Sequence, residues 1–304
     1  MTARNANLLR EISALKVERQ AVILAHHYQT EDVQSIADFT GDSLELSQQA
    51  AATKAKVIVF CGVYFMAETA KILAPDKIVL LPERNAGCPM ADMITAPKLE
   101  EKKASHPGAA VVCYVNSTAE VKAASDICCT SANAVKVVSS LDADEIIFVP
   151  DKHLGSWVAA MTHKKIHPWP GFCPTHACIG PEDIAEKKRQ YPQALVAVHP
   201  ECRPEVIAMA DVVLSTSGII RYGAQANVKQ LIVGTEIGVV HRLMKENQGR
   251  EFVPATDMAV CPSMKLTTLN SVLRALQNME PEITVPEDIR TGALTTMRRM
   301  LEVT

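Results

Sequence analysis

Apolar runs of four to six residues recur along this chain, and a short polar turn follows each run. The pattern is clearest in AVILAHHYQTEDVQSIADFTGDS at 21–43, AVVCYVNSTAEVKAASDICCTSA at 110–132 and LVAVHPECRPEVIAMADVVLSTSG at 195–218. In each stretch the turn leads into a short helical segment that ends in Ala-Asp or Ser-Asp. Continuously apolar runs of this length are typical of strands buried on both faces, as in parallel sheets.

The three stretches continue in the same way. Each is followed by a second apolar strand, at 57–62, 145–151 and 230–236; by an amphipathic helix, at 65–73, 154–162 and 239–246; and by a further strand, at 77–83, 165–171 and 251–257. Strands that alternate with helices predict parallel βαβ units with helices on both faces of each sheet.

An aspartate ends the first helical segment of each stretch and marks the repeat. Asp38, Asp126 and Asp211 lie 88 and 85 residues apart. The repeat predicts an α/β fold of three pseudo-threefold-related αβα units, with parallel sheets around a central cavity. We expect a first unit at 1–106 with an N-terminal helix, a second at 107–192, and a third at 193–304 with C-terminal helices.

A Cys-Pro pair ends the irregular loop after the last strand of each unit. The pairs are Cys88-Pro89, Cys173-Pro174 and Cys261-Pro262, which follow the marker aspartates by 50, 47 and 50 residues. Within GFCPTHACIG at 171–180 the repeat therefore selects Cys173, because Cys178 has no counterpart in the other units.

Polar residues recur where the first strand of each unit ends and where the next helix is expected to begin. They are His26, Tyr114 and His199, 12 residues before the markers; Tyr28, Asn116 and Glu201, 10 before; and Ser43, Ser131 and Thr216, five after. Ligands of parallel α/β sheets bind beyond the carboxyl ends of strands, so we expect all nine around the cavity. Hydroxyl groups at helix starts cap free backbone N–H groups, and helix N-termini attract anions, which favours a phosphate or carboxylate ligand.

Composition narrows the class of protein. The 304 residues have a net charge of −3, which argues against a bulk nucleic-acid binder or a polybasic membrane protein. The N-terminal segment resembles an amphipathic helix rather than a secretory signal, and no apolar run approaches the roughly 18–20 residues that span a bilayer. We therefore expect a cytoplasmic protein that binds neither nucleic acid nor membrane, with its nine cysteines reduced.

Three thiols on one axis predict a metal centre of one of two kinds. Structural zinc usually has four protein ligands, whereas a 4Fe-4S cluster held by three cysteines leaves one iron open as a Lewis acid. His176 follows Cys173 by three residues, where the other units have Ala91 and Met264, so we expect it to bind ligand. The other cysteines are interpreted as buried strand or loop residues: Cys61, Cys113, Cys128, Cys129, Cys178 and Cys202.

Several long motifs resemble those of the quinolinate synthase family, in the same order over nearly the whole chain. They are AHHYQ, ADFTGDSLELS, FCGVYFMAETAKIL, GCPMADM, YVNSTAEVKAASD, CTSANAV, PDKHLG and HPEC, with the final cysteine loop. The resemblance implies three αβα units around a cavity and a 4Fe-4S cluster on Cys88, Cys173 and Cys261. It also implies an enzyme of de novo NAD biosynthesis that condenses iminoaspartate with dihydroxyacetone phosphate to give quinolinate, phosphate and water.

The same resemblance implies roles for individual residues. The implied catalytic residues are Glu201, Tyr28, His26 and His199, with Glu201 the first choice as acid or base. The implied substrate-binding residues are His26, Tyr28, Ser43, Tyr114, Asn116, Ser131, His176, His199, Glu201 and Thr216. His27, in AHHY, departs from the asparagine expected of relatives and should point away from the cavity. An enzyme that produces iminoaspartate is the expected transient partner.

Two other classes of protein stay open at this point. An iron–sulfur sensor would use the three cysteines without turnover, although it would not need His26, Tyr28 and Glu201 around an anion site. A hydrolase or aldolase would hold zinc at the three thiolates. A redox pair of Cys178 with Cys202 is a further alternative that we do not favour.

The choice between the two cysteines of GFCPTHACIG gives a first prediction. Cys173→Ala should abolish the brown absorption of the 4Fe-4S cluster because it removes a ligand, whereas Cys178→Ala should retain the cluster and most activity. Absorption spectra and iron content of the two anaerobically purified variants measure this. Loss of the cluster from Cys178→Ala would contradict the assignment from the repeat.

Overall fold

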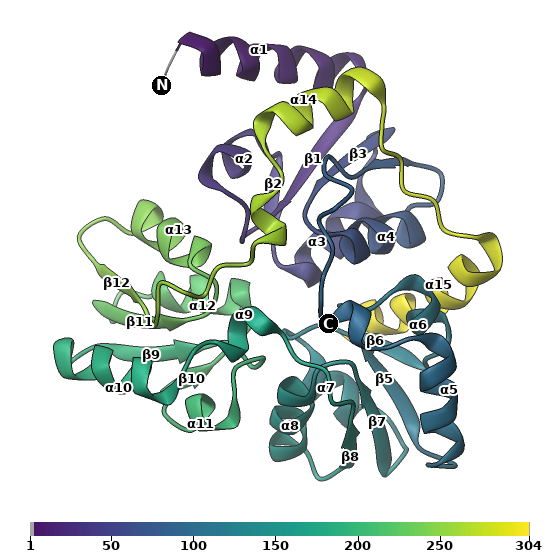
Figure 1. The fold of residues 1–304 in the computed structure, drawn as a ribbon, viewed down its shortest axis with the longest axis vertical. Coiled ribbons are helices and arrows are strands. Elements are labelled where there is room, and N and C mark those ends of the chain that lie inside the picture. The colour runs from purple at the N-terminus through teal and green to yellow at the C-terminus, as the bar shows by residue number, and fades with distance from the viewer. Residues whose placement is uncertain (1–2, 304) are drawn as a thin grey trace.

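Three four-stranded parallel sheets form the framework of the protein (Figure 1), whose computed structural model describes residues 3–303. The first sheet has the order β2 (Phe39–Gly41), β1 (Ala21–His26), β3 (Val57–Cys61), β4 (Ile78–Leu80). The second has β6 (Ile127–Cys129), β5 (Ala110–Tyr114), β7 (Glu145–Val149), β8 (Lys165–Pro168). The third has β10 (Val212–Val213), β9 (Leu195–Val198), β11 (Gln230–Gly234), β12 (Glu251–Pro254). The strand order is the same in all three, so the predicted α/β fold of three αβα units is confirmed.

Helices alternate with these strands along the chain. Those of the first sheet are α1 (Ala3–Glu18), α2 (Glu31–Ile36), α3 (Ser43–Ala52), α4 (Tyr64–Leu73) and the 3-10 turn η1 (Ala91–Met93). Around the second lie α5 (Ala96–Ala104), α6 (Ala119–Ala123), α7 (Ala134–Ser139) and α8 (Lys152–Met161), and α9 (Pro174–Ala177) follows between the second and third units. The remainder are α10 (Pro181–Gln190), α11 (Pro204–Ile207), α12 (Thr216–Gly223), α13 (Gly238–Glu246), the 3-10 turn η2 (Ser263–Lys265), α14 (Leu269–Asn278) and α15 (Glu287–Glu302). No helix in the described part of the chain has the length and apolar character needed to cross a membrane.

The marker aspartates directly precede the short strands β2, β6 and β10, and they bond to the neighbouring strands β1, β5 and β9. Each accepts, through Oδ2, a hydrogen bond from a backbone N–H 15 residues earlier, and its own N–H donates to the carbonyl of that same residue. The pairs are Ile23–Asp38, Val111–Asp126 and Val196–Asp211, with N to Oδ2 distances of 2.8, 2.7 and 2.7 Å. This pair of hydrogen bonds, here called the aspartate clamp, recurs in each unit and fixes where β2, β6 and β10 begin.

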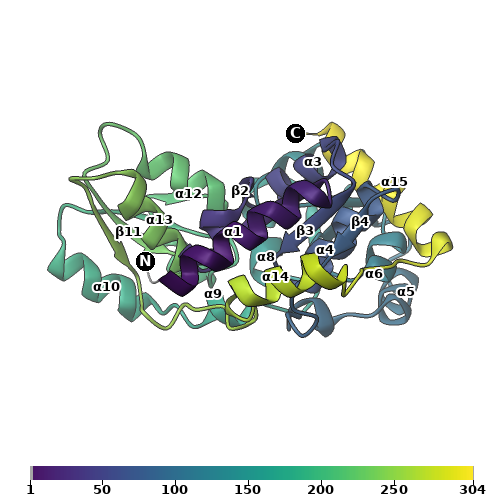
Figure 2. The same ribbon diagram turned by 90° about the horizontal axis from the view of Figure 1, so that it is seen from above.

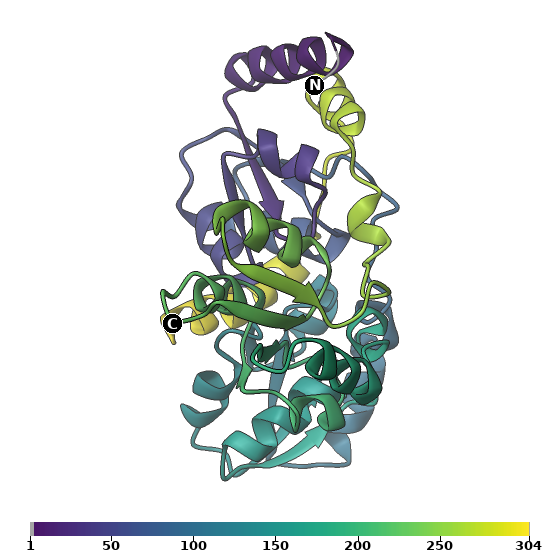
Figure 3. The same ribbon diagram turned by 90° about the vertical axis from the view of Figure 1, so that its left-hand side faces the viewer.

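The C-terminal helices pack on the first and second sheets, away from the third. Val272 and Leu276 of α14 share a buried cluster with Ile12 of α1 and Ile23 of β1. Helix α15 lies against α6 and β6, and Arg299 donates to the carbonyl of Asp126. Figures 2 and 3 show α14 and the C-terminal end of α15 on opposite faces of the molecule. Helix α15, which also contacts α4, therefore ties the first two units together, while the unit boundaries stay predictions.

The largest hydrophobic cluster crosses all three units. It includes Phe60 of the first unit, Phe148 of the second and Phe252 of the third, all 5% exposed or less. Burial of apolar area stabilises folded proteins by about 25 cal/mol per Å². Because this shared core lies between the sheets, it holds their strand ends in a fixed arrangement.

The aspartate clamp gives a second prediction. Asp126→Ala should lower the free energy of unfolding by about 1–2 kcal/mol, because the amide of Val111 loses a charged hydrogen-bond acceptor. Asp126→Asn keeps an acceptor oxygen and should recover part of this loss. Urea unfolding followed by circular dichroism measures the effect, with the exposed Asp144→Ala as control. Equal stability of the Asp126→Ala and Asp144→Ala variants would contradict a clamp.

Candidate active site

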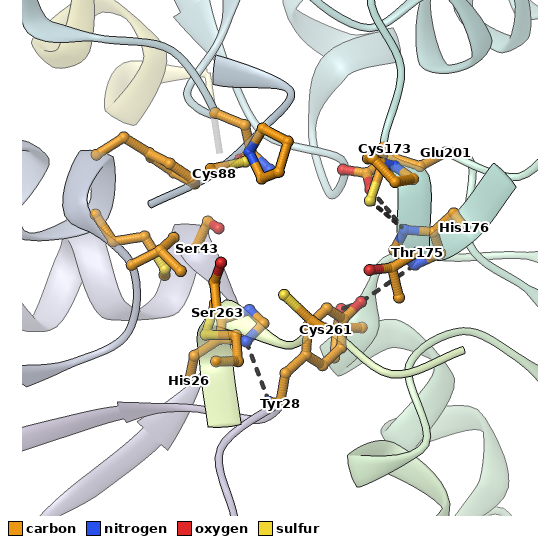
Figure 4. A pocket seen from close by; sticks show the side chains of 18 of the residues that line it. His26, Tyr28, Ser43, Cys88, Cys173, Thr175, His176, Glu201, Cys261 and Ser263 are labelled. Atoms are coloured by element: carbon orange, nitrogen blue, oxygen red, sulfur yellow. Dashed lines mark hydrogen bonds and ion pairs between the residues drawn. The ribbon is translucent and has the colours of Figure 1, made fainter. Parts of the chain in front are cut away.

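A cavity of about 140 Å³ lies where the three sheets meet. Every residue that the sequence predicts for the site lines it: His26, Tyr28, Ser43, Cys88, Tyr114, Asn116, Ser131, Cys173, His176, His199, Glu201, Thr216 and Cys261. They come from all three units, and those that Figure 4 labels surround one space. The geometry therefore brings the predicted residues together, while their individual roles stay predictions.

One cysteine of each unit reaches this cavity. Cys88 follows β4, Cys173 precedes α9, and Cys261 precedes η2; Figure 4 shows them on different sides of the cavity. Burial raises the pKa of the Cys88 thiol to about 12, and it raises the pKa of the Cys173 and Cys261 thiols as well. Three thiols in such a place become thiolates only beside a strong positive charge, so the donor set fits a metal centre.

His26 and His199 occupy equivalent positions and are fixed in the same way. Nδ1 of His26 accepts from the backbone N–H of Tyr28 at 3.1 Å, and Nδ1 of His199 accepts from that of Glu201 at 3.3 Å. Burial, followed by the neighbouring His176, lowers the pKa of His199 to about 3; burial and His27 lower the pKa of His26. Both rings are therefore neutral at pH 7, with the proton on Nε2.

Glu201 lies at the centre of a short chain of buried hydrogen bonds. Its Oε2 lies 2.7 Å from His176 Nδ1, and its Oε1 accepts from the hydroxyl of Tyr114 at 2.5 Å. Burial alone would raise the pKa of Glu201, but His176, His199 and the Tyr114 hydroxyl together lower it. Burial and the Glu201 charge raise the pKa of Tyr114. The site thus holds an ionised carboxylate between a phenol and an imidazole.

Thr235 is a buried residue behind the cavity wall that sequence reasoning missed. Its hydroxyl lies 2.8 Å from Tyr28 Oη and 2.9 Å from His176 Nε2. Tyr28 Oη also lies 3.0 Å from Thr216 Oγ1. Burial and the charge of Glu201 raise the pKa of Tyr28, so this hydroxyl stays protonated. Thr235 follows β11 directly, and that position beyond a strand end is the signal that could have indicated it.

The hydroxyl residues near the helix starts do not cap those helices as expected. Helix α3 begins at Ser43, but Asp42 accepts from Leu44 and Glu45. Helix α12 begins at Thr216, and its cap is Ser215. Ser131 lies in the turn before α7, which begins three residues later, so the expected helix start there is wrong. Ser43 and Thr216 therefore line the cavity without capping a helix, and the Thr216 hydroxyl lies 3.0 Å from Tyr28 Oη.

Other lining residues were not predicted from the sequence. Val63, Phe65 and Met66 form an apolar part of the wall, and Thr175 and Ser263 add hydroxyl groups. Buried polar atoms normally have hydrogen-bond partners. Within residues 3–303, however, the buried Oδ1 of Asn116 has none, and this oxygen is an acceptor available to a ligand.

A buried ion pair supports the third cysteine loop. Glu236, fully buried, lies 2.8 Å from Lys265 Nζ and accepts from the backbone N–H of Cys261 at 3.2 Å and of Gly238 at 2.7 Å. Lys265 also donates to the carbonyl of Tyr28. These contacts hold the Cys261 loop of the third unit against the first unit.

Known proteins resemble this chain in sequence over nearly its whole length. A family model described as quinolinate synthetase A protein matches residues 10–302. The chain belongs to this family. Quinolinate synthases of Dehalococcoides mccartyi strain CBDB1 and Methanoregula boonei are 60% and 58% identical to it, over 96% and 97% of this chain and 97% and 98% of their own. That of Geotalea uraniireducens is 56% identical over 96% of both chains.

Membership of the quinolinate synthetase A family confirms the resemblance seen in the sequence. The relatives are named as synthases, so the prediction of an enzyme is also confirmed. The cluster, the substrates and the roles of the lining residues stay proposals.

The remaining cysteines mostly lie where the sequence analysis expects them. Cys61, Cys113, Cys128, Cys129 and Cys202 are buried free thiols. Cys178 is a free thiol too, but it is exposed at the end of α9, so the expectation that it is buried is wrong. Its Sγ donates to the carbonyl of Thr175, and Sγ of Cys202 donates to that of Gly234. His27 does not line the cavity and bonds to Ser217, as expected of a side chain that points away.

Thr235 gives a third prediction. Thr235→Val should reduce kcat by about tenfold or more, because Tyr28 and His176 both lose the hydroxyl that orients them. Thr235→Ser should restore most activity, since it returns the hydroxyl alone. Steady-state kinetics of the two variants measure this, with the exposed Thr295→Val as control. Unchanged kcat in Thr235→Val would contradict an orienting role.

Proposed function

We propose that this enzyme condenses iminoaspartate with dihydroxyacetone phosphate to form quinolinate, phosphate and water, and so acts in de novo NAD biosynthesis. One observation carries the proposal: a cysteine from each of three units lines a cavity whose other polar residues suit anion binding and proton transfer. Relatives named quinolinate synthase, 54–61% identical over nearly the whole chain, support it.

Cys88, Cys173 and Cys261 would hold a 4Fe-4S cluster. Three thiolates are too few for an ordinary structural zinc site and suit a cluster with one open iron. When bound, the cluster supplies a Lewis acid at the cavity.

The carboxylate and phosphate groups of the substrates would bind to hydroxyl and amide groups. Ser43 and Thr216 stand at the first turns of α3 and α12, where backbone N–H groups favour anions. Ser131 lies 3.1 Å from His199 Nε2 and would share an anion with it. Asn116 Oδ1 would accept from a substrate amine, and the apolar wall of Val63, Phe65 and Met66 would exclude water from the growing ring.

Glu201 and His176 would move protons as a pair. A carboxylate with a lowered pKa is a weak base alone, but Oε2 can accept a proton that passes through His176 Nδ1, 2.7 Å away. Tyr114 would hold the charge on Oε1, and Tyr28 would donate a hydrogen bond from a hydroxyl that stays protonated. Ring closure with loss of two waters needs repeated proton transfers of this kind. The neutral imidazoles of His26 and His199 would donate from Nε2.

Two further proposals concern the surroundings of the enzyme. We infer a cytoplasmic location and transient contact with the enzyme that produces iminoaspartate. Binding of nucleic acid or membrane is not part of the proposed function, in keeping with the small net charge of −3.

The activity is the fourth prediction. Under anaerobic conditions, the cluster-loaded protein should convert iminoaspartate and dihydroxyacetone phosphate to equal amounts of quinolinate and inorganic phosphate. Glu201→Gln should lower the rate by about 10²- to 10⁴-fold with the cluster intact, because the variant cannot accept a proton. Quinolinate absorbance and phosphate release measure the reaction, and Glu205→Gln on the exposed side of α11 is the matched control.

Two outcomes would contradict the proposal. Absence of quinolinate from protein with a verified cluster would favour the iron–sulfur sensor, which binds a cluster without turnover. About one zinc and no sulfide per chain in anaerobically purified, active protein would favour the zinc enzyme.

A further inference from the structure

Three side chains on one wall of the cavity bring a sulfur, a nitrogen and a carboxylate oxygen together. The ligand atoms of Cys173, His176 and Glu201 all lie within 4.8 Å of one another. His176 Nδ1 is 2.7 Å from Glu201 Oε2 and 3.2 Å from Cys173 Sγ. Figure 4 shows these three side chains on one side of the cavity, apart from Cys88 and Cys261. Cys173 is thus the one cluster cysteine with a histidine and a carboxylate grouped around it in the described chain.

Local chain geometry explains the grouping. Cys173 is the N-cap of α9, and a residue three positions later in a helical turn lies on the same side. His176 therefore comes back beside the sulfur. Glu201 follows β9 in the third sheet, so the group joins two units.

Hydrogen bonds at the outer atoms leave the inner atoms facing one another. His176 Nε2 lies 2.9 Å from Thr235 Oγ1, and Glu201 Oε1 accepts from Tyr114 at 2.5 Å. Histidines and carboxylates that bind metals are usually oriented by such partners. With the outer atoms engaged, Nδ1 and Oε2 converge near the sulfur.

The close approach of these atoms requires a shared proton or a cation. His176 is 1% exposed and Glu201 is 3% exposed, so water screens the carboxylate poorly. Two acceptor atoms 2.7 Å apart repel each other unless a proton or a metal ion lies between them. A divalent cation would compensate the carboxylate and, in addition, a Cys173 thiolate.

We propose that the cluster-free chain binds one divalent transition-metal ion at Cys173 Sγ, His176 Nδ1 and Glu201 Oε2. The mixed sulfur, nitrogen and oxygen set suits zinc, ferrous or cobaltous ions, whereas magnesium and calcium prefer oxygen ligands alone. Binding displaces the thiol proton of Cys173 and the proton between His176 and Glu201, and both pass to solvent. Three protein ligands leave a fourth position open to the cavity, and Cys88 and Cys261 take no part.

The site has a consequence for cluster assembly, and this consequence rests on the proposed function. One ion on Cys173 occupies a thiolate that a three-cysteine cluster needs. Zinc bound there should therefore block reconstitution with iron and sulfide until a chelator removes it. Metal binding itself does not depend on the enzyme activity, so the two can fail separately.

Cobalt is the probe for the fifth prediction. The full chain, freed of iron and sulfide, should bind one Co²⁺ with tetrahedral visible bands and a thiolate charge-transfer band of single-thiolate intensity. The double variant Cys88→Ser/Cys261→Ser should give the same spectrum and affinity. His176→Gln and Glu201→Gln should each weaken binding by at least about tenfold, because each removes a ligand. Cys178→Ser, at an exposed thiol outside the cavity lining, is the control and should bind as the unmodified chain does.

A second measurement needs no variant. Zn²⁺ added to the metal-free chain before iodoacetamide should protect Cys173 from alkylation and leave Cys88 and Cys261 as reactive as without zinc, as peptide mass spectrometry can show. Equal protection of the three cysteines would overturn the proposal. A three-thiolate cobalt spectrum that the double cysteine variant loses would overturn it as well, because both results describe a metal held by the three cluster cysteines.

Discussion

Parallel strands of one sheet all end at the same edge, and this constraint determines where the chemistry of the protein can lie. The same strand order in three sheets gives three such edges, and they face one cavity. A residue placed directly after a first strand, such as His26 or His199, therefore reaches the centre without any long loop. The core that crosses the units, with Phe60, Phe148 and Phe252, keeps the edges together. Separating the sheets would expose the shared core to water and would disperse the residues of the site.

The pseudo-threefold arrangement accounts for the frame of the site but not for its reactive part. His26 and His199 share one tautomer because each accepts from the amide two residues later. The second unit has Tyr114 at that position, and its hydroxyl bonds to Glu201 of the third unit. His176 has no equivalent in the other units. A substrate whose two ends differ chemically needs different residues on the different walls of the cavity. We therefore expect the specific chemistry at the positions that depart from the threefold symmetry.

Much of this could be predicted from the sequence, because the repeat preserved its spacing. The marker aspartates hold strands at fixed separations, and their period led to the three Cys-Pro cysteines and to the nine polar residues of the cavity. What spacing could not reveal are contacts made across units. Thr235 acts on Tyr28 and His176, which are distant in sequence. The packing of α15 on the second unit and the exposure of Cys178 depend on the final arrangement in space, for which a local pattern carries no signal.

Buried charge is the main energetic cost of this cavity. The partners of each buried carboxylate indicate whether it supports the structure or takes part in the chemistry. Glu236 is satisfied by two backbone amides and Lys265, all within its own unit, so it holds the Cys261 loop and has little left to offer a ligand. Within residues 3–303, the carboxylate oxygens of Glu201 are hydrogen-bonded to two side chains, Tyr114 and His176. Desolvation makes any loss of those partners costly. A cation bound as proposed would take the place of the proton between Oε2 and His176 Nδ1 and leave the Tyr114 hydrogen bond in place. A carboxylate compensated in this exchangeable way is suited to proton transfer and to metal binding, which explains why both proposals meet at Glu201.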